Sequence, residues 1–229
     1  MSFFGNIAAN KALKAHQKGN YAEAQTLYRE AFEKGMTTPS LMLNFINLLV
    51  RDGKFDEALT VIKRMEKNGG LTEKDRLNMH IQYAIILWRK GHLDHAIEIL
   101  EEDMKRIKNG NLYGVLGYLL IEQGNAKKAQ EFNQAALEYD DADPIFLENM
   151  AQVYYRMLGD KATAKSYFEK VIQYKPTAID TNYFLALYDI EDGNAEEARK
   201  KLTISKEGRF TQLNYATPSM IDEKLSELS

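Results

Sequence analysis

Apolar residues recur every three or four positions along most of this chain, which is the spacing of one face of an α-helix. Stretches such as LMLNFINLLVRD and LYGVLGYLLIEQ show this pattern, and a glycine follows each of them within one residue. A second amphipathic stretch, such as FDEALTVIKRMEK, comes shortly after the glycine. The pattern therefore predicts pairs of helices, each pair joined by a short turn at a glycine.

The glycine turns recur at a regular period. The spacings between them are 34, 38, 33, 35 and 34 residues, and each glycine has an alanine five positions later. A period of this length, holding two helices, is typical of a helical repeat array. The six glycines are Gly19, Gly53, Gly91, Gly124, Gly159 and Gly193.

Small and bulky residues also keep fixed distances from these glycines. The alanines, from Ala24 in the first unit to Ala198 in the last, fall on the first turn of the second helix, where a small side chain lets two helices approach closely. Bulky residues such as Tyr28 and Phe168 follow nine positions after the glycine, with Asn133 as the exception. One helix pair cannot bury both of its faces, so we expect the pairs to stack into a solenoid.

The ends of the helices carry recognisable signals. Glycine tolerates the left-handed backbone that ends a helix, and an Asn or Asp just after it can cap the next one. Proline and threonine suit helix starts. We expect second-helix caps at Asn20, Asn125, Asp160 and Asn194, and helix starts near Pro39, Thr72, Pro144 and Thr217 with Pro218.

These features together resemble the tetratricopeptide repeat family, over about residues 5 to 205. The segment NLYGVLGYLLIEQGNAKKAQEFNQAALEYDDADP follows the family pattern most closely, with Tyr113, Leu116, Gly117 and Ala129 in place. The closing proline of the family stands in place only at Pro176, and the fifth repeat fits only if RMLGD contains one added residue. The resemblance implies an all-α, right-handed superhelical solenoid of about six helix–turn–helix repeats.

The chain is expected to divide into a repeat array over 1–205 and a C-terminal part over 206–229. In the C-terminal part, Ile221, Leu225 and Leu228 share one helical stripe, which predicts a capping helix. The alternative is a tail that folds into the groove of its own chain or of a neighbour. The expected repeats cover about 5–38, 39–70, 72–109, 110–142, 143–176 and 177–205.

The resemblance also implies a ligand groove. In the family, first helices line the concave face, and residues nine, six, three and two places before the glycine project into it. Amide side chains there could hold an extended peptide backbone, and Tyr, Trp and Arg dominate binding energy at interfaces. The candidate groove residues are Asn10, Asn44, Asn47, Arg51, Gln82, Ile85, Trp88, Arg89, Tyr118, Asn149, Gln152, Tyr155 and Arg156.

No pattern for catalysis or for a cofactor occurs. The chain has no cysteine, no glycine-rich phosphate loop and no HExxH motif. His92, His95 and Glu98 or Glu102 share a helix face in a metal-like spacing, but a further strong ligand is missing, so we expect a solvated surface. His16 and His80 stand isolated in the sequence. We therefore expect neither an enzyme nor a metal or cofactor site.

The charge and hydropathy of the chain limit the classes of partner that the sequence predicts. With 30 basic and 33 acidic residues the net charge is −3, which does not favour nucleic acid. No apolar run reaches the roughly 18 residues of a membrane helix, so we expect a cytoplasmic protein without membrane insertion. The predicted function is a scaffold that binds a protein or peptide, acidic groups of which would meet Arg51, Arg89 and Arg156. The alternative is self-assembly, with Phe3, Phe4 and Ile7 docking on the last repeat of another copy.

Overall fold

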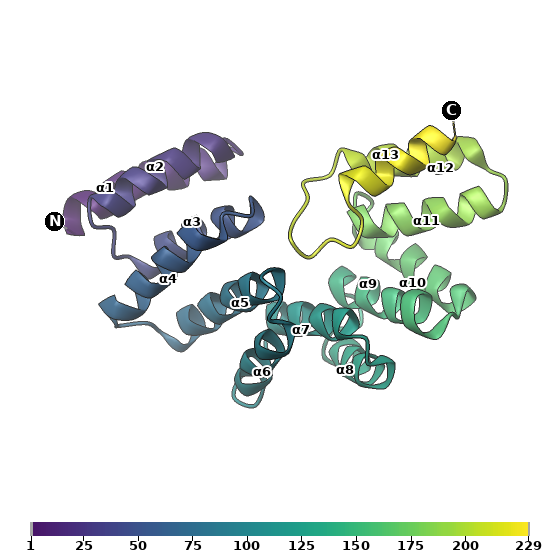
Figure 1. The fold of residues 1–229 in the computed structure, drawn as a ribbon, viewed down its shortest axis with the longest axis horizontal. Helices are drawn as coiled ribbons and strands as arrows, with labels where there is room; N and C mark the ends of the chain where they lie inside the picture. Colours follow the sequence, from purple (N-terminus) through teal and green to yellow (C-terminus); the bar gives the residue numbers. More distant parts are fainter. Residues whose placement is uncertain (1, 229) are drawn as a thin grey trace. The chain divides into compact units, whose positions relative to one another are not determined.

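The computed structural model describes residues 2–228, and their side chains from Phe4 onward. Over these residues it contains thirteen α-helices, one π-helical turn and no strand, arranged as successive helix pairs (Figure 1). The predicted all-α solenoid of helix pairs is confirmed. The contacts divide the chain into two compact units, Met1–Asp103 and Met104–Ser229.

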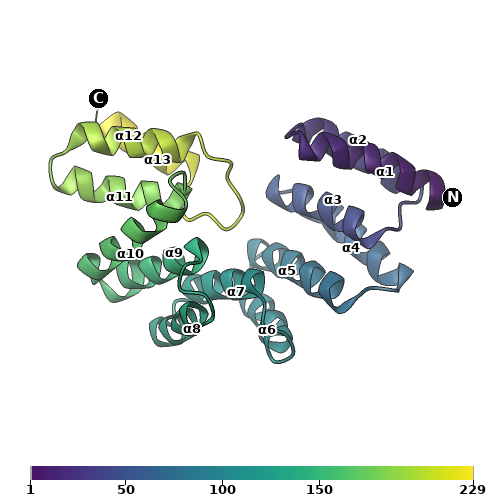
Figure 2. The same ribbon diagram turned by 180° about the vertical axis from the view of Figure 1, so that it is seen from behind.

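The first unit holds three successive helix pairs (Figures 1 and 2). Its helices are α1 (Ser2–Gln17), α2 (Tyr21–Glu33), α3 (Pro39–Arg51), α4 (Phe55–Asn68), α5 (Glu73–Arg89) and α6 (Leu93–Met104).

The second unit holds three further pairs and a last helix. Its elements are α7 (Gly110–Gln123), α8 (Ala126–Tyr139), α9 (Pro144–Gln152), the π-helical turn η1 (Val153–Leu158), α10 (Lys161–Tyr174), α11 (Ile179–Glu191), α12 (Ala195–Lys206) and α13 (Pro218–Glu227).

The repeated glycines and alanines act as predicted. All six turn glycines have positive φ, between 70° and 89°, which a residue with a Cβ adopts at a cost. All six alanines are completely buried, and so are Tyr28, Leu100 and Phe168 among the bulky positions. The period in the sequence therefore specifies both the turns and the contacts between helices.

The predicted helix starts are confirmed, but only two of the four expected second-helix caps are. Thr72 and Thr217 accept hydrogen bonds from backbone N–H groups in the first turns of α5 and α13. The side chains of Asn125 and Asp160 cap α8 and α10 in the same way. Asn20 and Asn194 stand at the expected N-cap positions of α2 and α12, but their side chains make no capping bond. The Asn20 side chain donates instead to Glu23.

The added residue of the fifth repeat is taken up by the π-helical turn η1. This turn ends at Gly159, where φ is 70°, and the N–H of Asp160 reaches back to the carbonyl of Tyr154 at 3.0 Å. A π-helical turn widens the helix by one residue without breaking it. The repeat therefore keeps its length in space although its sequence is longer.

Gly117 is required by a close approach of helices in the fourth repeat. A Cβ at this position would lie 2.3 Å from the Oδ1 atom of Asn133. Asn133 is fully buried, and its Nδ2 donates to the carbonyls of Gly117 and Ala129 at 3.2 and 2.9 Å. The departure at Asn133 from the bulky pattern is thus matched by a glycine on the facing helix.

The C-terminal helix α13 covers the last helix pair, as the apolar stripe predicts. Ile221 is completely buried, and Leu225 and Leu228 pack against the same apolar cluster. Lys206 of α12 forms an ion pair with Asp222 of α13 at 2.6 Å. The expected capping helix is therefore confirmed. Among the described residues, no helix has both the length and the apolar character needed to cross a membrane.

Candidate functional site

The first unit carries a row of amide side chains on its first helices. Asn10 of α1, Asn44 of α3 and Gln82 of α5 each stand nine residues before a turn glycine, and α3 contacts both α1 and α5. Asn10 is exposed and the other two are half-buried, while Asn47 on α3 is exposed. Amides at matching positions of neighbouring helices can donate to and accept from an extended backbone.

Asn44 lies beside the hydroxyl group of Tyr28. Burial raises the pKa of Tyr28 to about 12, and the nearby Asn44 side chain opposes part of this shift. The phenol is therefore neutral over the whole physiological range. The row of amide side chains thus gains no charged group beside Asn44 from this tyrosine.

The C-terminal ends of α3 and α5 supply the remaining candidates of this unit. The Arg89 guanidinium carbon lies 4.5 Å from the centroid of the Trp88 ring. Arg89 is exposed, whereas Trp88 and Arg51 are half-buried. Ile85 is only 5% exposed and belongs to the core, so its side chain does not present a surface to a ligand. The predicted role of Ile85 is corrected accordingly.

Three candidates of the second unit are buried, which corrects their predicted role. Asn149 is 3% exposed, and its Nδ2 donates to the carbonyl of Gly114 at 2.9 Å. Gln152 is 1% exposed and accepts a hydrogen bond from Arg156, and Tyr118 is 4% exposed. A Cβ at Gly117 would lie 2.9 Å from the Nδ2 atom of Asn149, so the glycine leaves room for this amide to point inward. Asn149 thus joins α9 to α7, whereas Gln152 bonds to a residue one turn further along the same helical run.

Tyr155 and Arg156 also have partners within the second unit. The Tyr155 ring packs on Phe184 with 4.8 Å between ring centroids. Arg156 donates to Gln152 at 2.9 Å and to Glu122 at 2.8 Å. A guanidinium held by two acceptors is fixed in orientation. Arg156 therefore offers a ligand the flat face of its guanidinium group, because its N–H donors are directed at Gln152 and Glu122.

A pair of carboxylates in the second unit was missed by the sequence analysis. Asp180, at the start of α11, is 1% exposed, and burial together with the charge of Glu148 raises its pKa to about 7. Burial likewise raises the pKa of Glu148, against two hydrogen bonds from Thr181. No signal of spacing marks this pair, since Glu148 and Asp180 stand on different helices.

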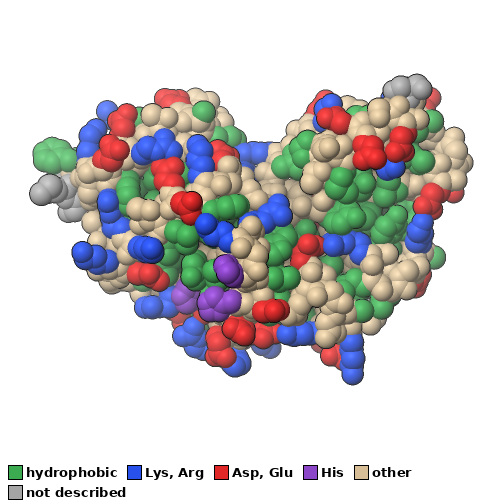
Figure 3. All heavy atoms as spheres, viewed as in Figure 1, with side chains coloured by type: hydrophobic (Ala, Val, Ile, Leu, Met, Phe, Trp, Pro, Cys, Tyr) green, Lys and Arg blue, Asp and Glu red, His purple; other side chains and the backbone are tan. Residues whose placement is uncertain are grey.

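The histidines do not form a metal site in the described part of the chain. Figure 3 shows histidine side chains at the surface over α5 and α6. His80, which stands isolated in the sequence, has its Nδ1 atom 2.8 Å from an oxygen of the buried Asp103 in the folded chain. His95 and Glu98 are 3.4 Å apart and exposed. Residues 2–228 contain no group of three or more potential ligands able to hold a metal ion.

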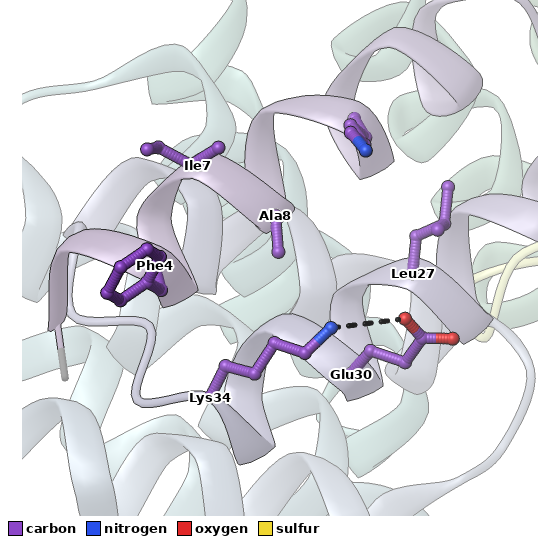
Figure 4. Close-up of a pocket in the computed structure, with 7 residues that line it drawn as sticks. Phe4, Ile7, Ala8, Leu27, Glu30 and Lys34 are labelled. Carbon is purple, nitrogen blue, oxygen red and sulfur yellow. Dashed lines mark ion pairs between the residues drawn. The ribbon is translucent and has the colours of Figure 1, made fainter.

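A groove with an apolar floor lies on the first helix pair (Figure 4). It has a volume of about 480 Å³, and Phe4 and Ile7 on its rim are 71% and 46% exposed. Leu27 of α2 also lines it, beside an ion pair between Lys34 and Glu30 at 3.6 Å. The side chain of Phe3, the third residue predicted here, lies outside the described part.

Comparison with known families supports the repeat assignment. Residues 110–143 and 146–177 match the tetratricopeptide repeat model, and residues 43–70 match the PPR repeat model. A TPR repeat-containing protein of Methanocaldococcus jannaschii is 24% identical over 162 residues, which cover 70% of this chain and 28% of the relative. The pre-mRNA-splicing factor cwf3 of Schizosaccharomyces pombe is 21% identical over 248 residues, covering 88% of this chain and 31% of the relative. The chain thus spans less than a third of the length of either relative.

Solved structures share the fold at low sequence identity. A tetratricopeptide repeat protein from Parabacteroides merdae has a TM-score of 0.73 at 15% identity, over 98% of this chain and 84% of that one. PilW, a widely conserved type IV pilus biogenesis factor, has a TM-score of 0.67 at 14% identity, over 98% of this chain and 97% of its own. The APC/C complex Cut9–Hcn1 has a TM-score of 0.68 at 14% identity, over 96% of this chain and 42% of the matched chain. Proteins with this fold generally mediate protein–protein interaction and are typically non-catalytic scaffolds.

Proposed function

This chain is built from tetratricopeptide repeats, and on that premise we propose that it is a cytoplasmic, non-enzymatic scaffold that binds a peptide segment or a folded partner. The proposed binding surface lies on the first helices α1, α3 and α5 of the first unit. The observation that carries this proposal is the row of amides Asn10, Asn44 and Gln82 on α1, α3 and α5, which remain exposed or half-buried.

The partner is proposed to be an extended segment with acidic groups. Arg51 and Arg89 stand at the C-terminal ends of α3 and α5, close in sequence to the amide row. Arginine binds carboxylates through paired N–H donors, while the amides hold the backbone of the segment. Trp88 adds an aromatic surface for an apolar side chain of the partner. Net charge −3 gives no general attraction to nucleic acid.

The test is calorimetric titration of an identified partner segment against variants of the full chain. A segment of this class binds with a Kd on the order of 1 μM. We expect Arg89→Ala to weaken binding about ten-fold or more, and Asn44→Ala about five-fold, because each removes a hydrogen-bonding group from the interface. Two exposed residues of α4 provide matched controls, Lys63→Ala and Asn68→Ala. Equal losses in the controls, or unchanged affinity in both groove variants, would reject this surface.

A second function, self-association, is favoured by the apolar groove on α1 and α2. Phe4 and Ile7 of α1 expose large apolar side chains in this groove. Exposed apolar patches of this kind mark interaction sites. A second copy docking here would extend the stack of helix pairs.

Light scattering at increasing concentration tests this alternative. If the groove mediates association, the mass of the wild type rises with concentration and Phe4→Glu stays monomeric, because a carboxylate is costly to bury. Tyr174→Glu is the control, since Tyr174 is 57% exposed but lies on α10 in the other unit. A wild type that remains monomeric at all concentrations excludes self-association.

A further inference from the structure

The segment between α12 and α13 follows a long path across α11. Residues 207–217 contain no regular helix, and in both ribbon views the chain leaves α12, passes beside α11 and returns to α13 (Figures 1 and 2). Its turn is held locally, because the N–H of Thr211 donates to Asn214 Oδ1 at 2.8 Å. Residues 210–215 are half-buried, so this stretch lies against the helices.

Asp180 holds the backbone of this segment. Its Oδ2 accepts from the N–H of Tyr215 at 2.9 Å, and its Oδ1 accepts from the N–H of Ala216 at 3.0 Å. Each carboxylate oxygen therefore binds one of two successive backbone N–H groups. The Asp180 carboxylate binds main-chain groups of the segment and no side chain, so any extended segment with two adjacent N–H groups could make the same contact.

The ring of Tyr215 fits between an aromatic ring and a cation. It stacks on Phe184 with 5.1 Å between centroids and 20° between ring planes. The guanidinium carbon of Arg156 lies 4.2 Å from the centroid of the same ring. Arg156 is kept flat against it by its hydrogen bonds to Gln152 and Glu122. Stacking and cation–π contacts both require an aromatic side chain at this place.

The residues that hold Tyr215 occupy groove positions of the repeat. Phe184 stands nine residues before Gly193, the same offset as Asn10, Asn44 and Gln82 before their glycines. Arg156 is itself one of the groove residues that the repeat pattern predicts. The chain thus places one of its own segments on the surface where the pattern predicts a ligand.

We infer that Asp180, Phe184 and Arg156 form a binding site for an extended peptide segment bearing an aromatic side chain, and that the chain's own Tyr215 occupies this site as an internal ligand. This inference deepens the proposed function, on which it rests, by naming the partner chemistry of the last repeats. The partner presents two successive backbone N–H groups to Asp180 and a tyrosine or phenylalanine ring to the slot between Phe184 and Arg156. It competes with residues 209–217 for the site.

The test uses a fluorescent peptide of residues 209–217, RFTQLNYAT, titrated by anisotropy against the full-length chain. We expect weak binding to the wild type, because the site is occupied, and about ten-fold tighter binding to Tyr215→Ala, which weakens the internal ligand. Adding Asp180→Ala to that variant should reverse the gain. Tyr174→Ala is the matched control, since it removes an exposed tyrosine from the same unit and should bind as the wild type does.

The peptide itself provides a second control. A peptide with alanine in place of its tyrosine should not bind the Tyr215→Ala variant, because nothing fills the slot between Phe184 and Arg156. Equal binding of both peptides, or equal binding of the Tyr215 peptide to wild type and Tyr215→Ala, overturns the inference.

An amide-exchange measurement on the wild type covers the case in which Tyr215→Ala does not fold. Saturating unlabelled peptide should speed hydrogen exchange of the Tyr215 and Ala216 amides in the isotope-labelled chain, while amides inside α11 stay protected. Unchanged exchange of these two amides overturns the inference. If exchange stays unchanged but Asn44→Ala and Arg89→Ala weaken partner binding in the calorimetric titration, only the internal ligand is rejected. If exchange speeds up but those two variants bind the partner normally, only the amide row is rejected.

Discussion

Replacing Phe168 by alanine should lower the free energy of unfolding of the second unit by about 3–5 kcal/mol, the usual cost of removing a fully buried phenylalanine. Phe168 is completely buried on α10 and stacks on Phe184 with 4.9 Å between ring centroids. The cavity left behind would also loosen the platform on which Tyr155 packs. Urea unfolding followed by far-ultraviolet circular dichroism measures the change.

The matched control for Phe168→Ala is Tyr174→Ala, which removes an aromatic ring from the same helix. Tyr174 is 57% exposed, so its loss should cost little. The single tryptophan, Trp88, lies in the other unit and reports unfolding there by fluorescence. Equal effects of the two substitutions would show that the repeat register assigned to α10 is wrong.

Stability should fall as the pH rises from about 4 to 7, because of Asp180. Its folded-state pKa of about 7 lies above the roughly 3.9 of an unfolded aspartate, so the folded chain binds more protons over this window. The penalty is absent below pH 4 and complete above pH 7. It amounts to at most about 4 kcal/mol for a shift of this size.

The groups around Asp180 account for the direction of this effect. Burial and the Glu148 carboxylate on α9 raise the pKa of Asp180. The N–H groups of Tyr215 and Ala216 and the side chain of Asn214 lower it. The charge of Lys175 lowers the pKa of Glu148, which burial raises. Asp180→Asn removes one of these two titrating carboxyl groups and should make the fall of the unfolding free energy with pH less steep. Asp192→Asn, at an exposed acid beyond the end of α11, should leave the slope in place. The same slope in all three proteins would contradict the assignment to Asp180.

The repeat architecture could be predicted because each of its determinants is local. A glycine with positive φ, a small residue five positions later and an apolar stripe act within one helix pair, and their period of about 34 residues places them in the same register each time. Pro39, Thr72 and Thr217 mark helix starts for equally local reasons. The failed second-helix caps at Asn20 and Asn194 show the limit, since a capping residue has alternative partners such as Glu23.

The sequence by itself therefore determined the helix pairs, their turns and the residues that join them, through a pattern repeated six times. Only the tertiary structure decided which polar side chains face inward. Asn149 turns to Gly114, His80 meets Asp103, and Asp180 binds the backbone of Tyr215. Each of these contacts joins residues that lie 23 to 35 positions apart. Such pairs depend on how helices pack, and a periodic pattern specifies the face of a helix but not the partner that each polar group finds there.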